Sequence, residues 1–205
     1  MEARGHVPKV QGVDRPADRR AEVERAALEL FASVGYRATR MSDVAQRLGI
    51  RGPSLYKHVT SKYELLTSIM TNTMQQLLEH QREALESTDD ITEKLRRMVE
   101  AHVRFHARHH LEAFVGNREI ENLHEPERAD VLRSRARYEL GLRNVIEAGA
   151  EHGSFVVSSA QLASYAIIDM GIGISLWYRA DGLISENTVA FTYGDFALRV
   201  VGLGY

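Results

Sequence analysis

The chain has 205 residues, of which 44% are hydrophobic and 26% are charged, as is ordinary for a soluble globular protein. It contains no cysteine, which excludes disulfides and thiolate metal sites and suits a reducing compartment. Residues 1–20 lack the apolar core of a signal peptide, and no apolar run approaches the length of a membrane span. We therefore expect a cytoplasmic protein with no membrane partner.

Charge is divided unevenly along the chain. Residues 1–62 carry 12 Lys or Arg and 7 Asp or Glu, a net charge of +5. The remaining residues carry 14 and 21, a net charge of −7. A basic N-terminal third on an acidic body favours the binding of a polyanion at that end.

Most of the chain has helical periodicity, and no alternating pattern typical of strands is present. Residues 1–17 have no periodicity and are predicted to form a flexible arm. Glycines, prolines and capping residues separate the predicted helices. These helices lie at about 18–34, 42–48, 53–59, 61–81, 91–109, 112–123, 126–149, 159–179 and 185–200. The sequence therefore predicts an all-α fold.

The two shortest predicted helices have the layout of a helix-turn-helix. Gly49 permits the positive φ angle that a tight turn needs, and Pro53 suits the first turn of the second helix. Ala45 is small where the two helices would cross, and Ile50 and Leu55 would fill the core beneath the turn. The second helix then exposes short or flat polar groups with few acids, which favours contact with nucleic acid. A plain helical bundle with a glycine turn is the alternative.

A pattern of residues without gaps extends this motif over about residues 20–70. Its members are Ala26, Leu28, Phe31, Gly35, Tyr36, Ala38, Thr39, Asp43, Val44, Ala45, Leu48, Gly49, Ile50, Ser54, Leu55, Tyr56, Lys57, His58, Val59, Ser61, Lys62, Leu65 and Leu66. The pattern resembles the N-terminal DNA-binding domain of the TetR family of transcriptional regulators. The resemblance implies a three-helix helix-turn-helix domain at 18–65 and a helical ligand-binding and dimerisation domain at 66–205.

The same resemblance implies which residues contact operator DNA. Ser42 would contact DNA from the start of the second helix, and Lys62 would clamp a phosphate with the first amides of the fourth helix. The recognition helix would contact bases and phosphates through Arg51, Gly52, Pro53, Ser54, Tyr56, Lys57 and His58. Arg40 departs from the family pattern, which often has a small hydroxyl residue there, and this leaves the N-cap of the second helix open.

A short recognition helix needs a second copy for specific binding. Palindromic operators present two half-sites about one turn of DNA apart, or a multiple of it, to a two-fold dimer. The resemblance implies a homodimer through the last two helices. The residues that would form the interface are Ala163, Ala166, Ile167, Met170, Gly171, Ile174 and Ser175 in one helix, and Val189, Phe191, Tyr193, Phe196, Val200 and Val201 in the other. The alternative is that both faces belong to the core of a single chain.

The C-terminal two thirds of the chain is expected to bind a small-molecule effector. Segments 117–119, 133–139 and 177–179 resemble TetR-type regulators of lipid and sterol catabolism, which often respond to acyl-CoA thioesters. Such a ligand needs an apolar cavity for its acyl chain and arginines for its phosphates. The predicted ligand-binding residues are Phe105, His106, His109, Phe114, Arg118, Tyr138, Met170, Trp177 and Arg179. An acyl-CoA and an unidentified apolar molecule are equal alternatives.

The expected mechanism is a shift between two populations. The ligand-free dimer spaces its recognition helices for the operator, and the effector favours a wider spacing, with helix 61–81 as the lever. The protein is thus expected to be a repressor that its effector releases from DNA. An activator would have the same sequence features.

Four histidines support a second hypothesis. His102, His106, His109 and His110 lie close together in the sequence, and the spacing of His102 and His106 suits chelation of a metal by one helix face. The protein would then be a metal-responsive regulator or a metal-dependent hydrolase. The sequence has no Gly-x-Ser-x-Gly elbow, phosphate loop or dinucleotide fingerprint. The preferred prediction is therefore a protein with no enzymatic activity, no metal and no cofactor.

Overall fold

Helices make up the regular structure of the described part of the chain. The computed structural model describes residues 16–202, with side chains from residue 19 onward. The predicted arm at 1–17 therefore falls almost wholly outside the described residues, and the first helix already begins at Pro16. The helices are α1 (Pro16–Val34), α2 (Met41–Arg47), α3 (Gly52–Leu55), α4 (Lys62–Glu86), α5 (Ile91–Arg108), α6 (His110–Glu119), the 3₁₀ turn η1 (Ile120–Asn122), α7 (Glu127–Glu151), α8 (Ala160–Trp177) and α9 (Glu186–Val200). No strand occurs between residues 16 and 202, which confirms the all-α prediction.

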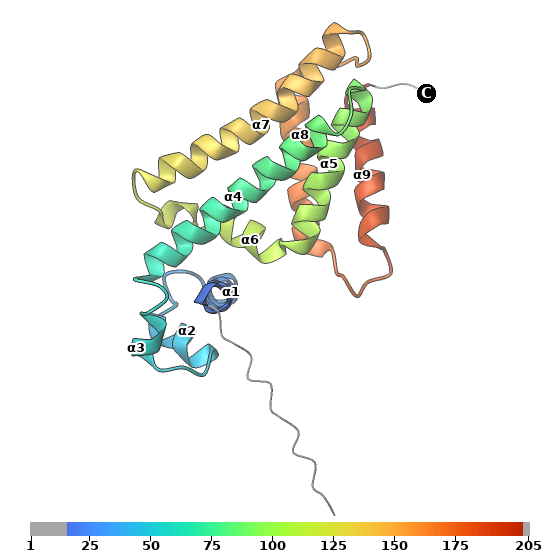
Figure 1. Cartoon of the computed structure of the whole chain (residues 1–205). Coiled ribbons are helices and arrows are strands. Elements are labelled where there is room, and N and C mark those ends of the chain that lie inside the picture. The colour runs from blue at the N-terminus through green and yellow to red at the C-terminus, as the bar shows by residue number, and fades with distance from the viewer. Residues whose placement is uncertain (1–15, 203–205) are drawn as a thin grey trace, which may run out of the picture.

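Helices α1, α2 and α3 pack around the beginning of α4 at one end of the molecule (Figure 1). The shared core of this region is apolar, and its fully buried side chains are Val23, Ala27, Phe31, Val44, Leu55, Leu65 and Leu66. Helix α4 is 25 residues long, so it continues from this core into the rest of the molecule, where it packs on α5 and α7. One rigid element thereby joins the two ends of the chain.

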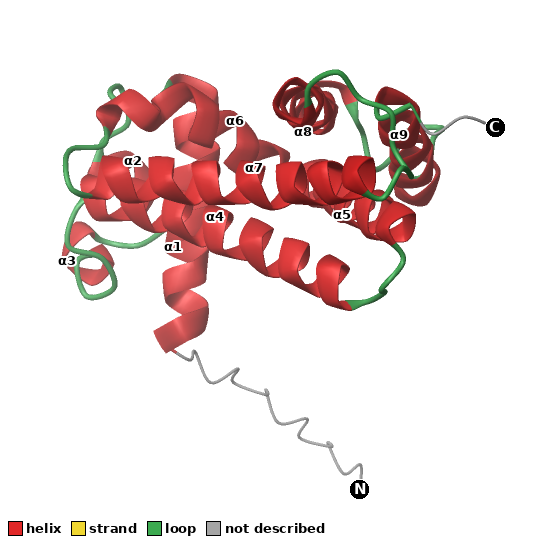
Figure 2. Cartoon of the chain, turned by 90° about the horizontal axis from the view of Figure 1, so that it is seen from above, coloured by secondary structure: helices red, strands yellow, loops and turns green. Residues whose placement is uncertain are grey.

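The C-terminal region is built around α5, which packs against α4, α7, α8 and α9 (Figure 2). The core of this region includes the buried side chains of Leu95, Val99, Val103, Leu142, Ile146, Ile167, Ile174, Ala190 and Ala197. Helix α8 approaches α5 closely at Gly171, where an added Cβ would lie only 2.1 Å from Cδ2 of His102. None of the described helices is long and apolar enough to cross a membrane.

Much of the face predicted for the dimer interface is used inside the chain. Ala163, Ile167, Gly171 and Ile174 of α8 are buried, because this side of the helix packs on α5 and α7. Val189 and Val201 of the α9 region are buried as well. The apolar side chains that α8 and α9 expose are Leu162, Tyr165, Leu176, Trp177, Phe191, Phe196 and Val200.

Candidate functional site

The predicted DNA contacts lie together at the end of the molecule formed by α2 and α3 (Figure 1). The exposed members are Ser42, Arg51, Pro53, Tyr56 and Lys57, and the half-buried members are Gly52, Ser54 and His58. The recognition helix is shorter than the predicted 53–59, because α3 ends at Leu55 and residues 56–58 form a turn. The predicted contacts after Leu55 are therefore presented by this turn.

Local backbone geometry fixes this end of the molecule. Gly49 has a φ of +65°, which side chains with a Cβ rarely adopt, and this turns the chain between α2 and α3. Leu55 is fully buried and anchors α3 to the core. The N-cap of α2 is Arg40, and its backbone N–H donates to Oδ2 of Asp43 at 2.8 Å. The Asp43 carboxylate thus satisfies the N–H of the N-cap residue, while the N–H of Asp43 donates to the carbonyl oxygen of Arg40 at 3.0 Å. Helix α2 begins one residue earlier than predicted.

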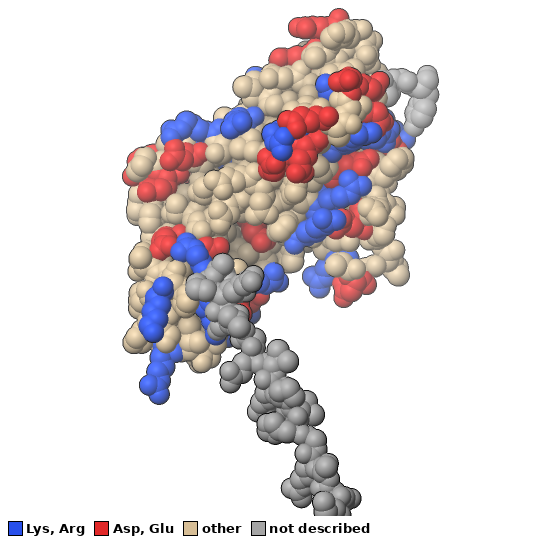
Figure 3. Space-filling model, viewed as in Figure 1, with Lys and Arg blue, Asp and Glu red and all other residues tan. Residues whose placement is uncertain are grey.

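Basic side chains project from the end formed by α2 and α3 (Figure 3). Within the described part of the chain, Arg40, Arg51 and Lys57 form no ion pair. Arg47, in contrast, lies 2.5 Å from a carboxylate oxygen of Glu29. A cation without an internal acid can contact a phosphate without first breaking an ion pair, which suits these three side chains to a polyanion.

Lys62, the predicted phosphate clamp, bonds to carbonyl oxygens within the chain. Its ammonium donates to the carbonyl oxygens of Tyr36 and Thr39, both at 2.8 Å, and to that of Arg37 at 3.4 Å. It also lies 4.4 Å from the centre of the Tyr36 ring. All three ammonium hydrogens therefore have acceptors within the chain. Lys62 fixes the segment between α1 and α2 against α4, and its contact with a phosphate stays a prediction.

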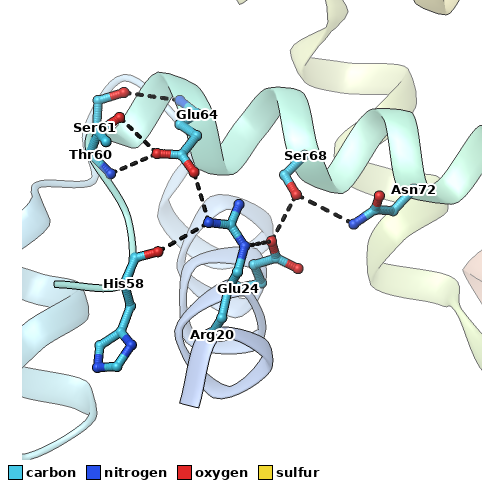
Figure 4. A network of polar contacts seen from close by, with 8 residues as sticks. All are labelled: Arg20, Glu24, His58, Thr60, Ser61, Glu64, Ser68 and Asn72. Atoms are coloured by element: carbon cyan, nitrogen blue, oxygen red, sulfur yellow. Dashed lines mark hydrogen bonds and ion pairs between the residues drawn. The ribbon is translucent and has the colours of Figure 1, made fainter. Parts of the chain in front are cut away.

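A polar network joins α1, the turn after α3 and the start of α4 (Figure 4). Glu64 accepts hydrogen bonds from the backbone N–H of Thr60 at 2.6 Å, from its hydroxyl at 2.7 Å and from Arg20 at 2.8 Å. Arg20 also donates to the carbonyl oxygen of His58 at 3.0 Å and to Glu24 at 3.2 Å. The bonds from Thr60, followed by Arg20, lower the pKa of Glu64 to about 2. This charged network holds the turn after α3 on α4.

Ser61 and Glu64 have the sequence spacing of a capping box at the start of α4, and this box forms only in part. The hydroxyl of Ser61 accepts the backbone N–H of Glu64 at 3.0 Å, as expected of an N-cap. The Glu64 carboxylate, however, bonds to Thr60 and Arg20. The long side chain bonds one residue further back than the capping box requires, because a cation of α1 lies there.

Helix α6 makes a second connection to the DNA-binding end. Glu119 is only 6% exposed, and its carboxylate accepts the backbone N–H of Tyr36 at 3.3 Å and the side-chain amide of Asn122 at 2.8 Å. Arg37 donates to the side-chain oxygen of Asn122 at 2.9 Å. The segment between α1 and α2 is therefore held by α4 through Lys62 and by the end of α6.

A cavity of about 450 Å³ lies between α4, α5, α6, α7 and α8. This volume lies within the range of small-molecule sites in proteins, and apolar side chains form most of the wall. The buried part of the wall consists of Thr73, Met74, Leu77, His102, His106, Ala113 and Tyr138. The exposed part consists of Asn117, Ala136, Tyr165 and Asp169. The cavity is therefore closed by α4 and α5 and opens to solvent where α6, α7 and α8 meet.

Two of the nine predicted ligand-binding residues, His106 and Tyr138, line this cavity. Phe105 is buried on another side of α5, where its ring stacks on that of His109 with centres 4.5 Å apart. One residue turns a helix by about 100°, so the side chain beside His106 faces away from the cavity. Phe105 and His109 line a separate, smaller hollow beside His80.

The other five predicted ligand-binding residues also lie outside the cavity wall. Phe114 is exposed on α6, and the Arg118 guanidinium lies 5.5 Å from the centre of its ring. Met170 is on α8, but the cavity-lining residues of that helix are on a neighbouring face. Trp177 and Arg179 are exposed at and beyond the C-terminal end of α8. The structure thus brings none of these five side chains to the cavity wall, although Phe114 and Arg118 contact each other.

Most of the cavity wall was not predicted. The missed residues are Thr73, Met74, Leu77, His102, Glu112, Ala113, Gly116, Asn117, Ala136, Glu139, Tyr165, Ile168, Asp169 and Ile172. Arg135, in the segment 133–139 that the resemblance singles out, is a candidate for anion contact and does line the wall. The helical spacing of Thr73 and Leu77 resembles ordinary core packing and carries no ligand signal. Asp169 is the more informative position, because a carboxylate within an apolar helix needs solvent or a partner.

The histidines do not form a metal site. His102 is buried, and its Nε2 bonds to the carbonyl oxygen of Ile168 at 3.1 Å while its Nδ1 bonds to the hydroxyl of Tyr138 at 2.9 Å. Both ring nitrogens of His102 are thereby used. No three His, Asp or Glu side chains among residues 19–202 are placed to hold a metal ion. The hypotheses of a metal-responsive regulator and a metal-dependent hydrolase are therefore not supported.

Together, the helix-turn-helix end and the cavity define a class of protein, the helical DNA-binding regulators with a separate ligand-binding region. Residues 25–69 match the family model of "Bacterial regulatory proteins, tetR family". Residues 88–201 match that of "Tetracyclin repressor-like, C-terminal domain". The chain belongs to the TetR family of bacterial regulators.

Curated relatives of the chain are transcriptional regulators. The repressor KstR2 of Rhodococcus jostii is 29% identical over 193 residues, which cover 93% of this chain and 95% of KstR2. The activator FasR of Mycolicibacterium smegmatis is 38% identical over 84 residues, which cover 41% of this chain and 38% of FasR. The full-length similarity is thus to a repressor, and the similarity to an activator is partial.

Solved structures share the fold over most of the chain. The TetR-family regulator PfmR of Thermus thermophilus has a TM-score of 0.79 and 33% sequence identity, covering 89% of this chain and 99% of PfmR. AibR, solved in complex with isovaleryl coenzyme A and operator DNA, has a TM-score of 0.77 and 20% identity. The structural match covers 88% of this chain and 98% of AibR. At 20% identity the similarity concerns the fold alone.

Proposed function

We propose that the chain is a transcriptional repressor that binds palindromic operator DNA as a homodimer and is released by a small, largely apolar effector. The observation that carries this proposal is that the cavity and the DNA-binding end share α4 and α6. Thr73 and Leu77 of α4 line the cavity, while Glu64 of the same helix holds Arg20 of α1. A ligand that binds more tightly to one position of these helices would change the affinity for DNA. The coupling is reciprocal, so DNA would change the affinity for the ligand by the same factor.

The exposed apolar side chains of α8 and α9 support dimerisation through these helices. Leu162 is 67% exposed, Trp177 is 46% exposed and Phe196 is 39% exposed. Large apolar groups gathered on the exposed sides of two helices are typical of a protein–protein interface. A two-fold pairing of these helices would present two recognition ends to two operator half-sites. The relatives are regulators, so we propose a DNA-binding role in the cytoplasm without catalysis.

An acyl-CoA is the finer effector class that we propose to test first. A volume of about 450 Å³ would hold a short or branched acyl group but not a whole coenzyme A. The nucleotide would therefore lie outside, near the mouth, where Arg135 of α7 lines the wall and forms no ion pair within the described residues. AibR, with the same fold, binds isovaleryl coenzyme A.

The test measures release from DNA. An operator is first selected from genomic fragments, and its Kd is measured by fluorescence anisotropy with isovaleryl-CoA, octanoyl-CoA, palmitoyl-CoA or coenzyme A alone. We expect at least one thioester to weaken DNA binding tenfold or more, with no effect of coenzyme A. An unchanged operator Kd with all three thioesters would contradict the acyl-CoA class.

A matched pair of variants places the effect in the cavity. Ala136 is exposed at the cavity mouth, and Ala150 is exposed on the same helix but does not line the cavity. Ala136→Trp should keep operator binding and lose the response to the thioester, because the indole would block the mouth. Ala150→Trp should keep both properties. Release that persists unchanged in Ala136→Trp would place the effector elsewhere.

A further inference from the structure

His106 is a buried polar side chain with no hydrogen-bond partner in the described part of the chain. It lies on the cavity wall, is 4% exposed, and neither of its ring nitrogens is bonded. His102, one turn earlier on α5, has both nitrogens bonded to the protein. A buried imidazole without a partner destabilises the folded chain. This position therefore points to a group that enters the cavity from outside.

The surroundings of His106 select the neutral form of its ring. The ring lies against that of His102, with centres 4.4 Å apart, and against Phe105 at 5.6 Å. Burial, followed by the neighbouring His102 and His109, lowers the pKa of His106 to about 2. A neutral imidazole has one N–H donor and one acceptor nitrogen. It can bond to a carbonyl or a hydroxyl oxygen, but it offers no charge to a carboxylate.

The charged side chains of the wall do not favour a charged ligand group at the inner end of the cavity. Glu139 accepts the hydroxyl of Ser164 at 2.5 Å and lies 3.3 Å from Arg143. Arg135 donates to the carbonyl oxygen of Gly116 at 2.8 Å. Asp169 is exposed at the mouth, so Arg135 and Asp169 supply opposite charges near the opening. Glu112, the fourth charged residue of the wall, lies 3.3 Å from Nδ1 of His109. The closed end is apolar apart from Thr73, Tyr138 and the two histidines, and the Tyr138 hydroxyl and His102 already bond to each other.

We propose that the cavity binds a compact, mostly hydrocarbon molecule that carries an uncharged carbonyl or hydroxyl oxygen at its inner end, and that His106 hydrogen-bonds to this oxygen. The inference rests on the proposed function only in taking the cavity as the effector site. Within the proposed acyl-CoA class, this favours an acyl group that carries such an oxygen on its hydrocarbon part, because a plain saturated chain would leave His106 unpaired. A site built around a hydrogen bond discriminates against analogues that lack the bonding group.

The experiment compares three bicyclic probes of nearly equal size: the hydrocarbon tetralin, its ketone 2-tetralone and its alcohol 2-tetralol. Calorimetric titration of the full chain without DNA gives each Kd. We expect the wild type to bind the ketone or the alcohol at least tenfold more tightly than tetralin. In His106→Leu this preference should vanish or reverse. His110→Leu is the control, because His110 is exposed and does not line the cavity.

Three results would overturn the proposal: equal binding of tetralin and the oxygenated probes by the wild type, no binding of either oxygenated probe, or an unchanged preference in His106→Leu. A readout without substitution covers the case in which His106→Leu does not fold. The ¹⁵N resonances of the His106 ring should shift when 2-tetralone is added, whereas those of the bonded His102 ring should shift little. Unmoved His106 resonances at saturating ketone would also overturn it.

Failure of this inference and failure of the proposed function are distinguishable. Probe binding is measured without DNA, and operator binding of the wild type is measured without a probe. An oxygen preference through His106 in a protein that selects no operator would contradict only the proposed function. Specific operator binding without an oxygen preference would contradict only the role of His106.

Discussion

At the scale of single residues, a few polar groups connect the DNA-binding end to the long helix α4. Glu64 bonds to Thr60 and Arg20, and Lys62 bonds to three carbonyl oxygens between α1 and α2. Hydrogen bonds of this kind involve a charged partner and are stronger than neutral ones. The position of the recognition end on α4 therefore depends on two neighbouring side chains.

Replacing Glu64 tests this connection. Glu64→Gln removes the charge that Arg20 faces, and we expect the free energy of unfolding to fall by about 1–2 kcal/mol at pH 7. Chemical denaturation measures the change. The exposed Glu79, which pairs with Arg82 on the same helix, provides the control, since Glu79→Gln should alter stability little.

The same network predicts a dependence of stability on pH. The pKa of Glu64 is lowered to about 2 in the folded chain, so its contribution is present in full above about pH 4.5 and is lost as the pH falls toward 2. The wild type and Glu64→Gln should therefore converge in stability over this interval. A stability difference that stays constant from pH 6 to pH 3 would show that the carboxylate charge is not responsible.

Sequence patterns predicted local contacts better than distant ones. The Ser61 cap followed from a spacing of three residues. The contacts of Lys62 did not follow, because they depend on carbonyl oxygens 23 to 26 residues earlier in the chain. Phosphate and carbonyl oxygens attract the same ammonium group, and only the fold decides which one lies nearby.

At the scale of elements, the packing of α8 on α5 shapes the cavity. Gly171 lets α8 approach the bonded ring of His102, and Ile168 of the same helix accepts a hydrogen bond from that ring. A side chain at Gly171 would push the helices apart. The contact between Gly171 and His102 belongs both to the core and to the cavity wall. We therefore expect both stability and ligand binding to depend on it.

A pair of glycine substitutions tests the close approach. In Gly171→Ala the new Cβ would lie 2.1 Å from the His102 ring, and we expect a loss of about 1–3 kcal/mol in the free energy of unfolding. In Gly116→Ala the nearest atom is 3.8 Å away, so the better helix former should leave stability equal or slightly higher. Thermal and chemical denaturation of ligand-free protein measure both. Equal stabilities would refute the tight contact.

Periodicity located the helices but not the partner of each face. Helix α8 is apolar on several sides, so its sequence alone did not show that Ile167 and Ile174 pack inside the chain while Leu162 and Trp177 are exposed. The length of the recognition helix was also overpredicted. Residues 56–58 follow a helical pattern but form a turn, because the chain must redirect into α4.

At the scale of the whole molecule, the fold places a recognition end and a ligand cavity on shared helices. The family resemblance predicted the helix-turn-helix end, and most of the residues that it implies for DNA contact lie together there. The cavity was largely missed, because five helices converge on it and the ordinary apolar residues of its wall give no signal in a sequence. Of the predicted ligand residues, it contains His106 and Tyr138.

The dimer has its own test. Leu162→Glu and Phe196→Glu each add a charge to an exposed apolar side chain of α8 or α9, and we expect the proposed dimer to dissociate at micromolar concentration. Light scattering coupled to size exclusion gives the mass. Val34→Glu, on the exposed side of α1, should leave the dimer intact. A dimer unaffected by both α8 and α9 variants would move the interface to another surface.

The central claim is that the end formed by α2 and α3 binds a specific two-fold operator. The direct measurement is footprinting of the protein on genomic fragments, with the wild type beside the double variant Arg51→Ala and Lys57→Ala. We expect the wild type to protect an inverted repeat with half-sites about one turn of DNA apart, or a multiple of it. The double variant should remain dimeric and protect no site at the same concentration. Equal protection by both proteins, or no enriched fragment at all, would contradict the account.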